Sequence, residues 1–169
     1  MHDEEHKINQ VRGLLMDRVS ELEAMVIRTV ASPAIWDAVP FEKREALVNY
    51  ARRDILGDRQ RTATRNADAM RESTYEQLKE FFSLNNRTFD TSQKTRFLKK
   101  MLALVGMEDQ AAVLQEFIAE GGLNSVRNNY AHQTAQALDG EHSKEKCIVI
   151  RGQARRHVSN IKAVMDRFE

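Results

Sequence analysis

The feature that most constrains the fold is a helical repeat of apolar residues that continues through almost the whole chain. Over residues 4–31 apolar side chains recur at steps of three and four, which places them along one side of an α-helix. Ser32-Pro33 ends this helix, because proline disfavours helical backbone at the residue before it. A helix of this length has to cover its apolar stripe with other helices, and the stripe comprises Ile8, Val11, Leu15, Val19, Leu22, Met25, Val26 and Val30.

Shorter helices are predicted to follow, separated by proline, glycine and polar segments. Pro40 can begin a second helix, and Gly57 can end it. Residues 58–71 are polar and rich in arginine, so their pattern allows either an exposed helix or a mobile segment. Ser73 followed by Glu76 resembles a capping box, which predicts that another helix starts there.

The second half of the chain is also predicted to form helices that are separated by loops and glycines. A loop is expected over residues 84–90, and Ser92 can cap the helix that follows it. Gly106 ends that helix, and a short apolar helix then runs up to Gly121-Gly122. Behind this break, Asn124 or Ser125 can cap a helix over residues 125–138.

The last segment, residues 144–168, is predicted to be the C-terminal helix. Its apolar run over residues 147–150 could be a short strand or a buried helical turn. We favour the helix because no partner strand is visible elsewhere in the sequence. The whole pattern predicts an all-α fold, in which residues 1–169 form a single bundle of about six helices.

Composition limits the setting in which such a bundle works. None of the apolar runs approaches the roughly 18 residues that cross a membrane, and the N-terminus lacks the pattern of a secretory signal. Cys147 is the single cysteine, which excludes an intramolecular disulfide and fits a reducing compartment. We therefore expect a cytoplasmic protein without a membrane partner, and interpret Cys147 as a core thiol.

The charge pattern gives weak evidence for a nucleic-acid partner. The net charge is only +1, so binding to nucleic acid would need a local basic patch. Two segments are enriched in basic residues, 52–71 and 144–167. The other interpretation of both is a solvated helix face. The weak candidates for RNA contacts are Arg52, Arg53, Arg155 and Arg156.

Common sequence signatures of catalytic and metal sites are absent. The sequence has no glycine-rich phosphate loop ahead of a Lys-Ser/Thr pair, no dinucleotide fingerprint and no cysteine pair for zinc. His2 and His6 have the spacing of metal ligands, but they lie in a terminus that is expected to fray. No metal and no cofactor are therefore expected.

The stretch 127–132, Arg-Asn-Asn-Tyr-Ala-His, carries the most information about function. On a helix, Arg127 falls within the apolar face that contains Val126 and Tyr130, whereas Asn128 and His132 line the edge of the polar side. An arginine on an apolar face is costly unless it is paired or the face opens into a cleft. If the helix starts near residue 125, its first turn adds backbone N–H groups that favour an anion.

These residue types suit cleavage of RNA without a metal. The ribose 2′-hydroxyl must lose a proton to attack its own phosphate, and the leaving 5′-oxygen must gain one. A histidine that titrates near neutral pH can move these protons, and an arginine can hold the charged phosphate oxygens. The structural alternative makes Arg127 a salt-bridge residue between helices, His132 a hydrogen-bonded histidine at the core edge and Asn128 a second cap.

The string Arg-Asn-Asn-Tyr-Ala-His resembles the Arg-Asn-x-x-x-His signature of HEPN domains, including the alanine before the histidine. The signature covers six residues, and the helical layout agrees over most of the chain. HEPN proteins are small helical bundles, and many are metal-independent endoribonucleases of toxin–antitoxin, abortive-infection and CRISPR systems. The resemblance implies Arg127 and His132 as the catalytic pair, with Asn128 orienting them.

The resemblance also implies an assembly and a product. HEPN proteins usually dimerise so that two signatures face one cleft, which predicts a homodimer here. The expected reaction cleaves single-stranded or loop RNA and leaves a 2′,3′-cyclic phosphate. The alternative is a non-catalytic HEPN-like binding or scaffold protein, or an antitoxin-type partner. A cognate antitoxin or a nucleotidyltransferase is a candidate protein partner. The subfamily stays open, with the prokaryotic group linked to RNA repair and phage defence as one option.

Overall fold

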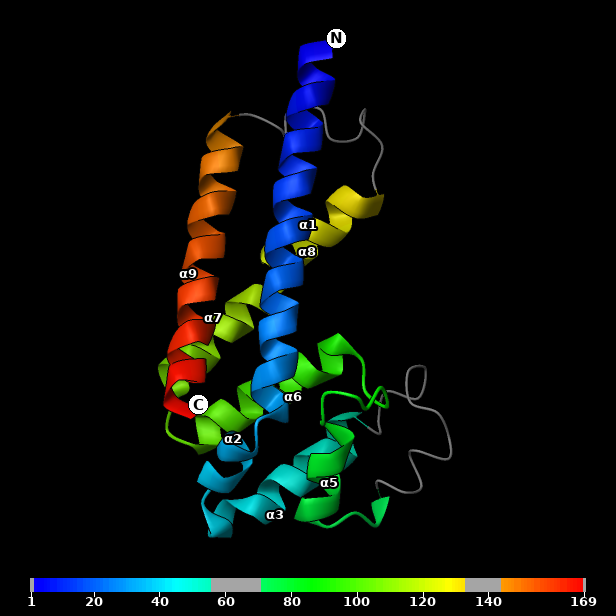
Figure 1. The fold of residues 1–169 in the computed structure, drawn as a ribbon, viewed down its shortest axis with the longest axis vertical. Coiled ribbons are helices and arrows are strands. Elements are labelled where there is room, and N and C mark those ends of the chain that lie inside the picture. The colour runs from blue at the N-terminus through cyan, green and yellow to red at the C-terminus, as the bar shows by residue number, and fades with distance from the viewer. Residues whose placement is uncertain (1, 56–70, 133–143, 169) are drawn as a thin grey trace.

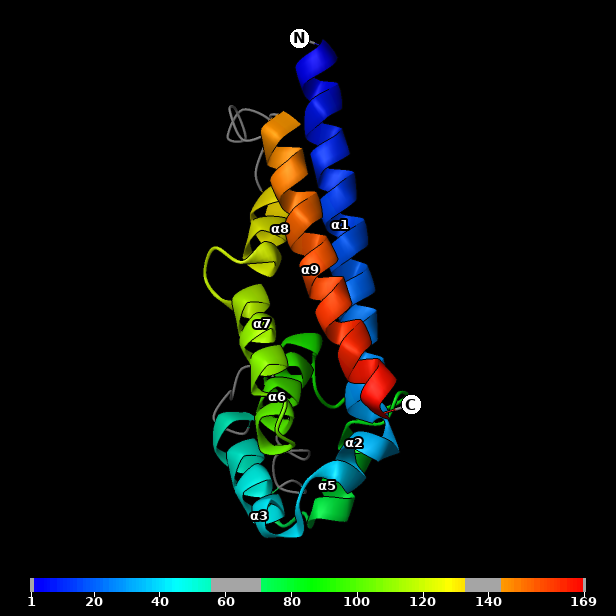
Figure 2. The ribbon, with the colours of Figure 1, turned by 90° about the vertical axis from the view of Figure 1, so that its left-hand side faces the viewer.

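The computed structural model describes residues 2–55, 71–132 and 144–168, and every regular element within them is helical. Two long helices, α1 (His2–Ala31) and α9 (Lys144–Phe168), lie side by side and run in the same direction (Figures 1 and 2). The expected all-α fold is therefore confirmed. The helix α9 covers the range that the sequence predicts, and the run over residues 147–150 is helical rather than a strand. The expected burial of this turn is wrong for Ile148 and Val149, which are exposed, whereas Ile150 is buried.

A second row of helices packs against this pair. Along it, α6 (Thr91–Leu104), α7 (Glu108–Ile118) and α8 (Leu123–His132) follow one another back toward the N-terminal end of α1 (Figure 2). Both α6 and α8 contact α1, whereas α7 contacts α9. The α1 stripe that the sequence predicts is buried between the rows, from Val11 to Val30.

The opposite end of the molecule holds the short helices. These are α2 (Pro33–Ala38), α3 (Phe41–Tyr50), which continues into a π-helical turn η1 (Ala51–Ile55), and α5 (Tyr75–Phe81) (Figure 1). An aromatic cluster holds them to α6, and Trp36 lies at its centre, against Tyr75, Phe82 and Phe97. The helix α2 was not expected, and Pro33, predicted only to end α1, occupies its first position, where its missing N–H costs nothing.

Two predicted helix caps are wrong by one or two residues. Thr74 rather than Ser73 caps α5, because its hydroxyl accepts from the Gln77 N–H while the Gln77 amide accepts from the Thr74 N–H. Asp90 rather than Ser92 caps α6 and forms the same kind of reciprocal box with Gln93. In both places a neighbouring polar residue closes a complete capping box, which satisfies two backbone N–H groups instead of one.

Candidate functional site

The turn before α8 determines where the motif lies on its helix. Gly121 has a φ of +79°, and a Cβ on Gly122 would lie 2.2 Å from the Glu116 carbonyl oxygen, so both positions require glycine. This tight turn starts α8 at Leu123, two residues earlier than the predicted start. The range expected for the motif helix, 125–138, is therefore corrected at its start, and residues 133–138 lie outside the described residues.

The early start changes the surroundings of Arg127. Asn124 lies inside α8 rather than capping it, and Arg127 is the fifth residue of the helix, in its second turn. The free backbone N–H groups of a helix belong to its first turn. The expectation that these groups join Arg127 in holding an anion is thus wrong by about one turn, and the guanidinium itself has to supply the binding.

The Arg127 side chain is fixed by three hydrogen bonds. Its Nη2 donates to Glu23 Oε1 at 2.9 Å and to Asn124 Oδ1 at 2.8 Å, and its Nε donates to Asn128 Oδ1 at 2.8 Å. The side chain is 18% exposed, so it is mostly buried between α8 and α1. A guanidinium has five N–H donors, and these bonds use the donors of Nε and Nη2. The two donors of Nη1 make no hydrogen bond to a described residue.

Glu23 is the residue of this site that the sequence did not indicate. It lies on α1, 104 positions before Arg127, and its carboxylate is 27% exposed. Because the two helices pack together, the carboxylate neutralises part of the arginine charge and holds the guanidinium in one orientation. Its only sequence signal is its place beside the buried stripe of α1, between Leu22 and Val26.

Arg127 and Asn128 are in contact in the structure, with Asn128 exposed and its Oδ1 accepting from the guanidinium. His132 is the last described residue of α8, and its side chain lies outside the described residues. On a regular helix, positions five apart are separated by about 7.5 Å along the axis and about 140° around it. One copy of α8 therefore presents the two positions on different sides of the helix.

The other candidate cations do not join this site. Arg52 donates from Nη2 to the Ser73 carbonyl oxygen at 3.0 Å, which gives it a structural role beside α5. Arg53 is exposed on η1. Arg156 forms a two-pronged ion pair with Glu116 of α7, whereas its neighbour Arg155 lines a groove between α1 and α9. Of these four arginines, only Arg155 therefore lies in a groove that other cationic side chains also line.

His157 is the buried titratable group next to that ion pair. Its ring is 6% exposed and packs edge-on against Phe117, with the ring centroids 5.5 Å apart. The Nδ1 atom is buried and makes no hydrogen bond to a described residue. Burial first, and then the positive charge of Arg156, lower the pKa of His157 below its usual value of 6.5, although Glu116 acts in the opposite direction.

We expect acid to destabilise the protein through His157. Below pH 6.5 the unfolded chain takes up the proton before the folded one does, so stability that is complete above this pH is lost as the pH falls. The loss from one group cannot exceed about 1.4 kcal/mol per pH unit. Urea unfolding at pH 7.5 and 5.5 should show that the free energy of unfolding falls less for His157→Leu than for the unmodified chain. An equal fall in both chains would show that His157 is not the cause of the acid sensitivity.

The described residues offer neither a metal site nor a membrane span. No group of three or more His, Cys, Asp or Glu side chains among them could hold a metal ion. None of the described helices is long and apolar enough to cross a membrane.

Comparisons with protein-family models, with curated proteins and with solved structures found no match. The likeness to HEPN domains therefore depends on residues 127–132 and on the helical layout alone. What the structure adds is the arrangement around Arg127. A guanidinium that is held on one side by a carboxylate and two amides can present its remaining nitrogen to an anion in a fixed direction.

Proposed function

We propose that this protein is a metal-independent endoribonuclease of the HEPN type, which cleaves single-stranded or loop RNA in the cytoplasm. The observation that carries the proposal is the fixed Arg127 guanidinium, with Asn128 bound to it, inside the Arg-Asn-x-x-x-His string. Oriented donors aimed at a developing charge are among the strongest contributions to catalysis, because they need no rearrangement during the reaction.

The reaction assigns one role to His132 and another to Arg127. His132 takes the proton of the 2′-hydroxyl, whose oxygen attacks the adjacent phosphorus. The Nη1 donors of Arg127, which make no hydrogen bond to a described residue, bind the non-bridging phosphate oxygens as their negative charge grows. The bond to the 5′-oxygen breaks, and that oxygen receives a proton from the imidazolium of His132, which leaves a 2′,3′-cyclic phosphate and a 5′-hydroxyl and restores the neutral histidine. Unstacked RNA is preferred, because the A-form duplex keeps the 2′-oxygen out of line.

The active form in this proposal is a homodimer. Positions 127 and 132 point about 140° apart on one helix, so a single copy grips a phosphate from one side only. A two-fold axis near α8 supplies a second arginine and a second histidine, and two-fold dimers are the commonest symmetric assembly. Mixing Arg127→Ala chains with His132→Ala chains should restore part of the activity if the site is shared, and a monomeric active enzyme would contradict the dimer.

A second candidate function is favoured by the Arg127–Glu23 ion pair itself. An arginine that is already neutralised by a carboxylate at 2.9 Å can be a structural link between α8 and α1. The protein would then be a non-catalytic HEPN-like binding or scaffold protein. Co-purification of a stoichiometric partner, such as an antitoxin or a nucleotidyltransferase, without RNA cleavage would support this candidate. If the first candidate function is correct, the protein is instead the toxin of a toxin–antitoxin system or the nuclease of a phage-defence system.

Glu23→Gln separates the two candidates. Glutamine keeps an oxygen that accepts from Arg127 but removes the competing negative charge. If Arg127 binds the scissile phosphate, the variant should bind an uncleavable RNA about four times more tightly at 0.15 M salt, because the guanidinium charge is no longer neutralised and one phosphate contact on a single strand is worth roughly that factor. This RNA carries a 2′-deoxy substitution at each nucleotide that is cut. The probe is measured by fluorescence anisotropy.

The matched control is Glu45→Gln, an exposed glutamate of α3 with the same change of charge. It reports the effect of net charge alone and should change RNA affinity by less than Glu23→Gln does. If the two variants bind RNA equally, Arg127 does not contact phosphate and the scaffold candidate is favoured. Cleavage of ordinary RNA by the same variants provides the second readout.

A further inference from the structure

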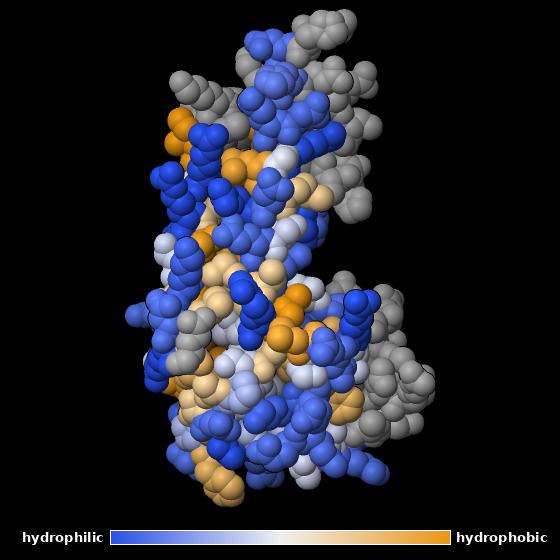
Figure 3. All heavy atoms as spheres, viewed as in Figure 1, coloured by the Kyte–Doolittle hydropathy of each residue, from blue (hydrophilic) through white to orange (hydrophobic). Residues whose placement is uncertain are grey.

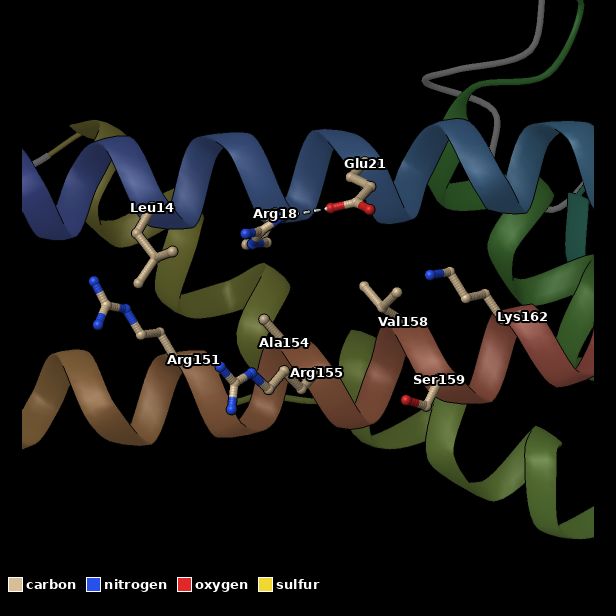
Figure 4. Close-up of a pocket in the computed structure, with 9 residues that line it drawn as sticks. All are labelled: Leu14, Arg18, Glu21, Arg151, Ala154, Arg155, Val158, Ser159 and Lys162. Atoms are coloured by element: carbon tan, nitrogen blue, oxygen red, sulfur yellow. Dashed lines mark hydrogen bonds and ion pairs between the residues drawn. The ribbon is translucent and has the colours of Figure 1, made fainter.

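A basic groove of about 610 Å³ lies between α1 and α9. Figure 4 shows Arg151 and Lys162 reaching from α9 toward α1, with Arg155 between them along the helix. Arg18 enters from α1 and is bound to Glu21 at 2.9 Å, one turn away. Four cations therefore line the groove against one carboxylate, in a chain whose net charge is only +1.

The three cations of α9 form a continuous row. Positions 151, 155 and 162 are spaced by four and seven residues, which keeps them on one side of the helix over about 16 Å. All three side chains are exposed, and none makes an ion pair with a carboxylate in the described part of the chain. Successive phosphates of a stacked strand rise about 3.4 Å along the axis, so the row is long enough to contact several of them.

The lining determines which kind of anion fits. Among the described residues, its apolar part is limited to Leu14, Ala154 and Val158, and no aromatic ring contributes to it. An acidic amphipathic helix would need a row of apolar anchoring sites, and bases would need rings to stack on. Guanidinium groups, by contrast, match phosphate oxygens directly. The groove is therefore suited to a phosphate backbone, without recognition of the bases.

The groove is separate from the surroundings of Arg127. Glu23, which binds Arg127, is about 140° around α1 from Arg18 and about 160° from Glu21. In the space-filling view, hydrophilic side chains dominate the face formed by α1 and α9, and smaller apolar patches interrupt them (Figure 3). A ligand in the groove thus lies on another side of α1 than the one that faces α8.

We propose that this groove binds the phosphodiester backbone of a nucleic-acid strand through Arg18, Arg151, Arg155 and Lys162. The inference goes beyond the proposed cleavage reaction and does not depend on it, because none of these residues contacts Arg127. Binding of this kind is independent of sequence and depends strongly on salt. For three or four phosphate contacts, log K should fall against log salt concentration with a slope of about −2 to −3.

The sharpest test compares two neighbouring arginines of α9. Arg155 lines the groove, whereas Arg156 points to Glu116, so Arg155→Gln and Arg156→Gln change the same charge on different sides of one helix. Both substitutions are made in an Arg127→Ala chain, so that cleavage does not consume the probe. The probes are a 12-nucleotide single-stranded RNA, the corresponding DNA and a polyglutamate peptide. Binding of each probe is measured by fluorescence anisotropy at 0.15 M salt. Thermal melting confirms that each variant folds.

We expect Arg155→Gln to weaken RNA and DNA binding about fourfold and the triple variant Arg151→Gln/Arg155→Gln/Lys162→Gln about sixtyfold, since each phosphate contact contributes about fourfold at this salt concentration. Arg156→Gln should change binding less than twofold. Similar affinities for RNA and DNA support recognition of the shared backbone. Equal effects of the two single variants, binding of polyglutamate alone, or no binding of either nucleic acid by the parent chain would each overturn the proposal. Loss of cleavage with groove binding intact would affect the proposed function only.

Discussion

Arg127→Ala is expected to lower the rate of RNA cleavage by about a hundred- to a thousandfold. Removing one oriented donor from a site of developing negative charge costs roughly this factor. Arg127→Lys should recover little, because an ammonium cannot make the separate bonds to Glu23, Asn124 and Asn128 and still present a fixed donor. Initial rates on a labelled single-stranded RNA measure both variants.

Two controls separate this effect from a loss of structure. Arg127→Ala leaves the Glu23 carboxylate without its partner, so the double variant Glu23→Gln/Arg127→Ala removes that charge as well. Arg156→Ala removes another arginine that is paired with a glutamate, at an exposed position. Cleavage should be lost in both Arg127 variants and kept in Arg156→Ala. Cleavage by Arg127→Ala at the parent rate would show that Arg127 is only a structural link.

Trp36→Ala is expected to lower the free energy of unfolding by about 3–5 kcal/mol, the range for removing a large buried ring. Trp36 is 1% exposed, stacks on Phe97 and donates from Nε1 to the Val30 carbonyl oxygen at 2.7 Å. Its loss would open a cavity and remove a hydrogen bond where α1, α2 and α6 meet. In a chain of this length the melting temperature should fall by about 6–20 °C.

Phe41→Ala is the matched control for this prediction. Phe41 is also aromatic and lies on the neighbouring helix α3, but it is 84% exposed. Its removal should change stability by less than about 0.5 kcal/mol. Trp36→Phe should lie between the two, because it keeps most of the ring volume and loses the N–H donor. Equal destabilisation by Trp36→Ala and Phe41→Ala would contradict the described core.

The long helices could be predicted because their evidence is local. The apolar spacing in α1 reports which side is buried, and Pro33 marks where the helix ends. Exact starts were less predictable, since Thr74 and Asp90 compete with polar neighbours for the capping position, and only a complete reciprocal box decides between them. At α8 the start depends on contacts of Gly122 with the preceding helix, which no local pattern contains.

The candidate site was predictable only in part for the same reason. Arg127 and Asn128 are adjacent in sequence, so their likeness to a known signature can be seen without a structure. Glu23 joins them only because α1 packs on α8, and the groove cations on α1 and α9 meet only because these helices lie side by side. Pairing between residues more than a hundred positions apart cannot be read from a single sequence.

Whether this protein is a metal-independent ribonuclease is decided by RNA cleavage in the presence of EDTA, measured for the unmodified chain and for His132→Ala in parallel. Several structured RNAs should be used, and the new ends should be analysed chemically. We expect the unmodified chain to cut loops without added metal and to leave 2′,3′-cyclic phosphate and 5′-hydroxyl ends, whereas His132→Ala should not cut. Equal cleavage by both chains, or no cleavage of any RNA by the unmodified chain, would contradict it.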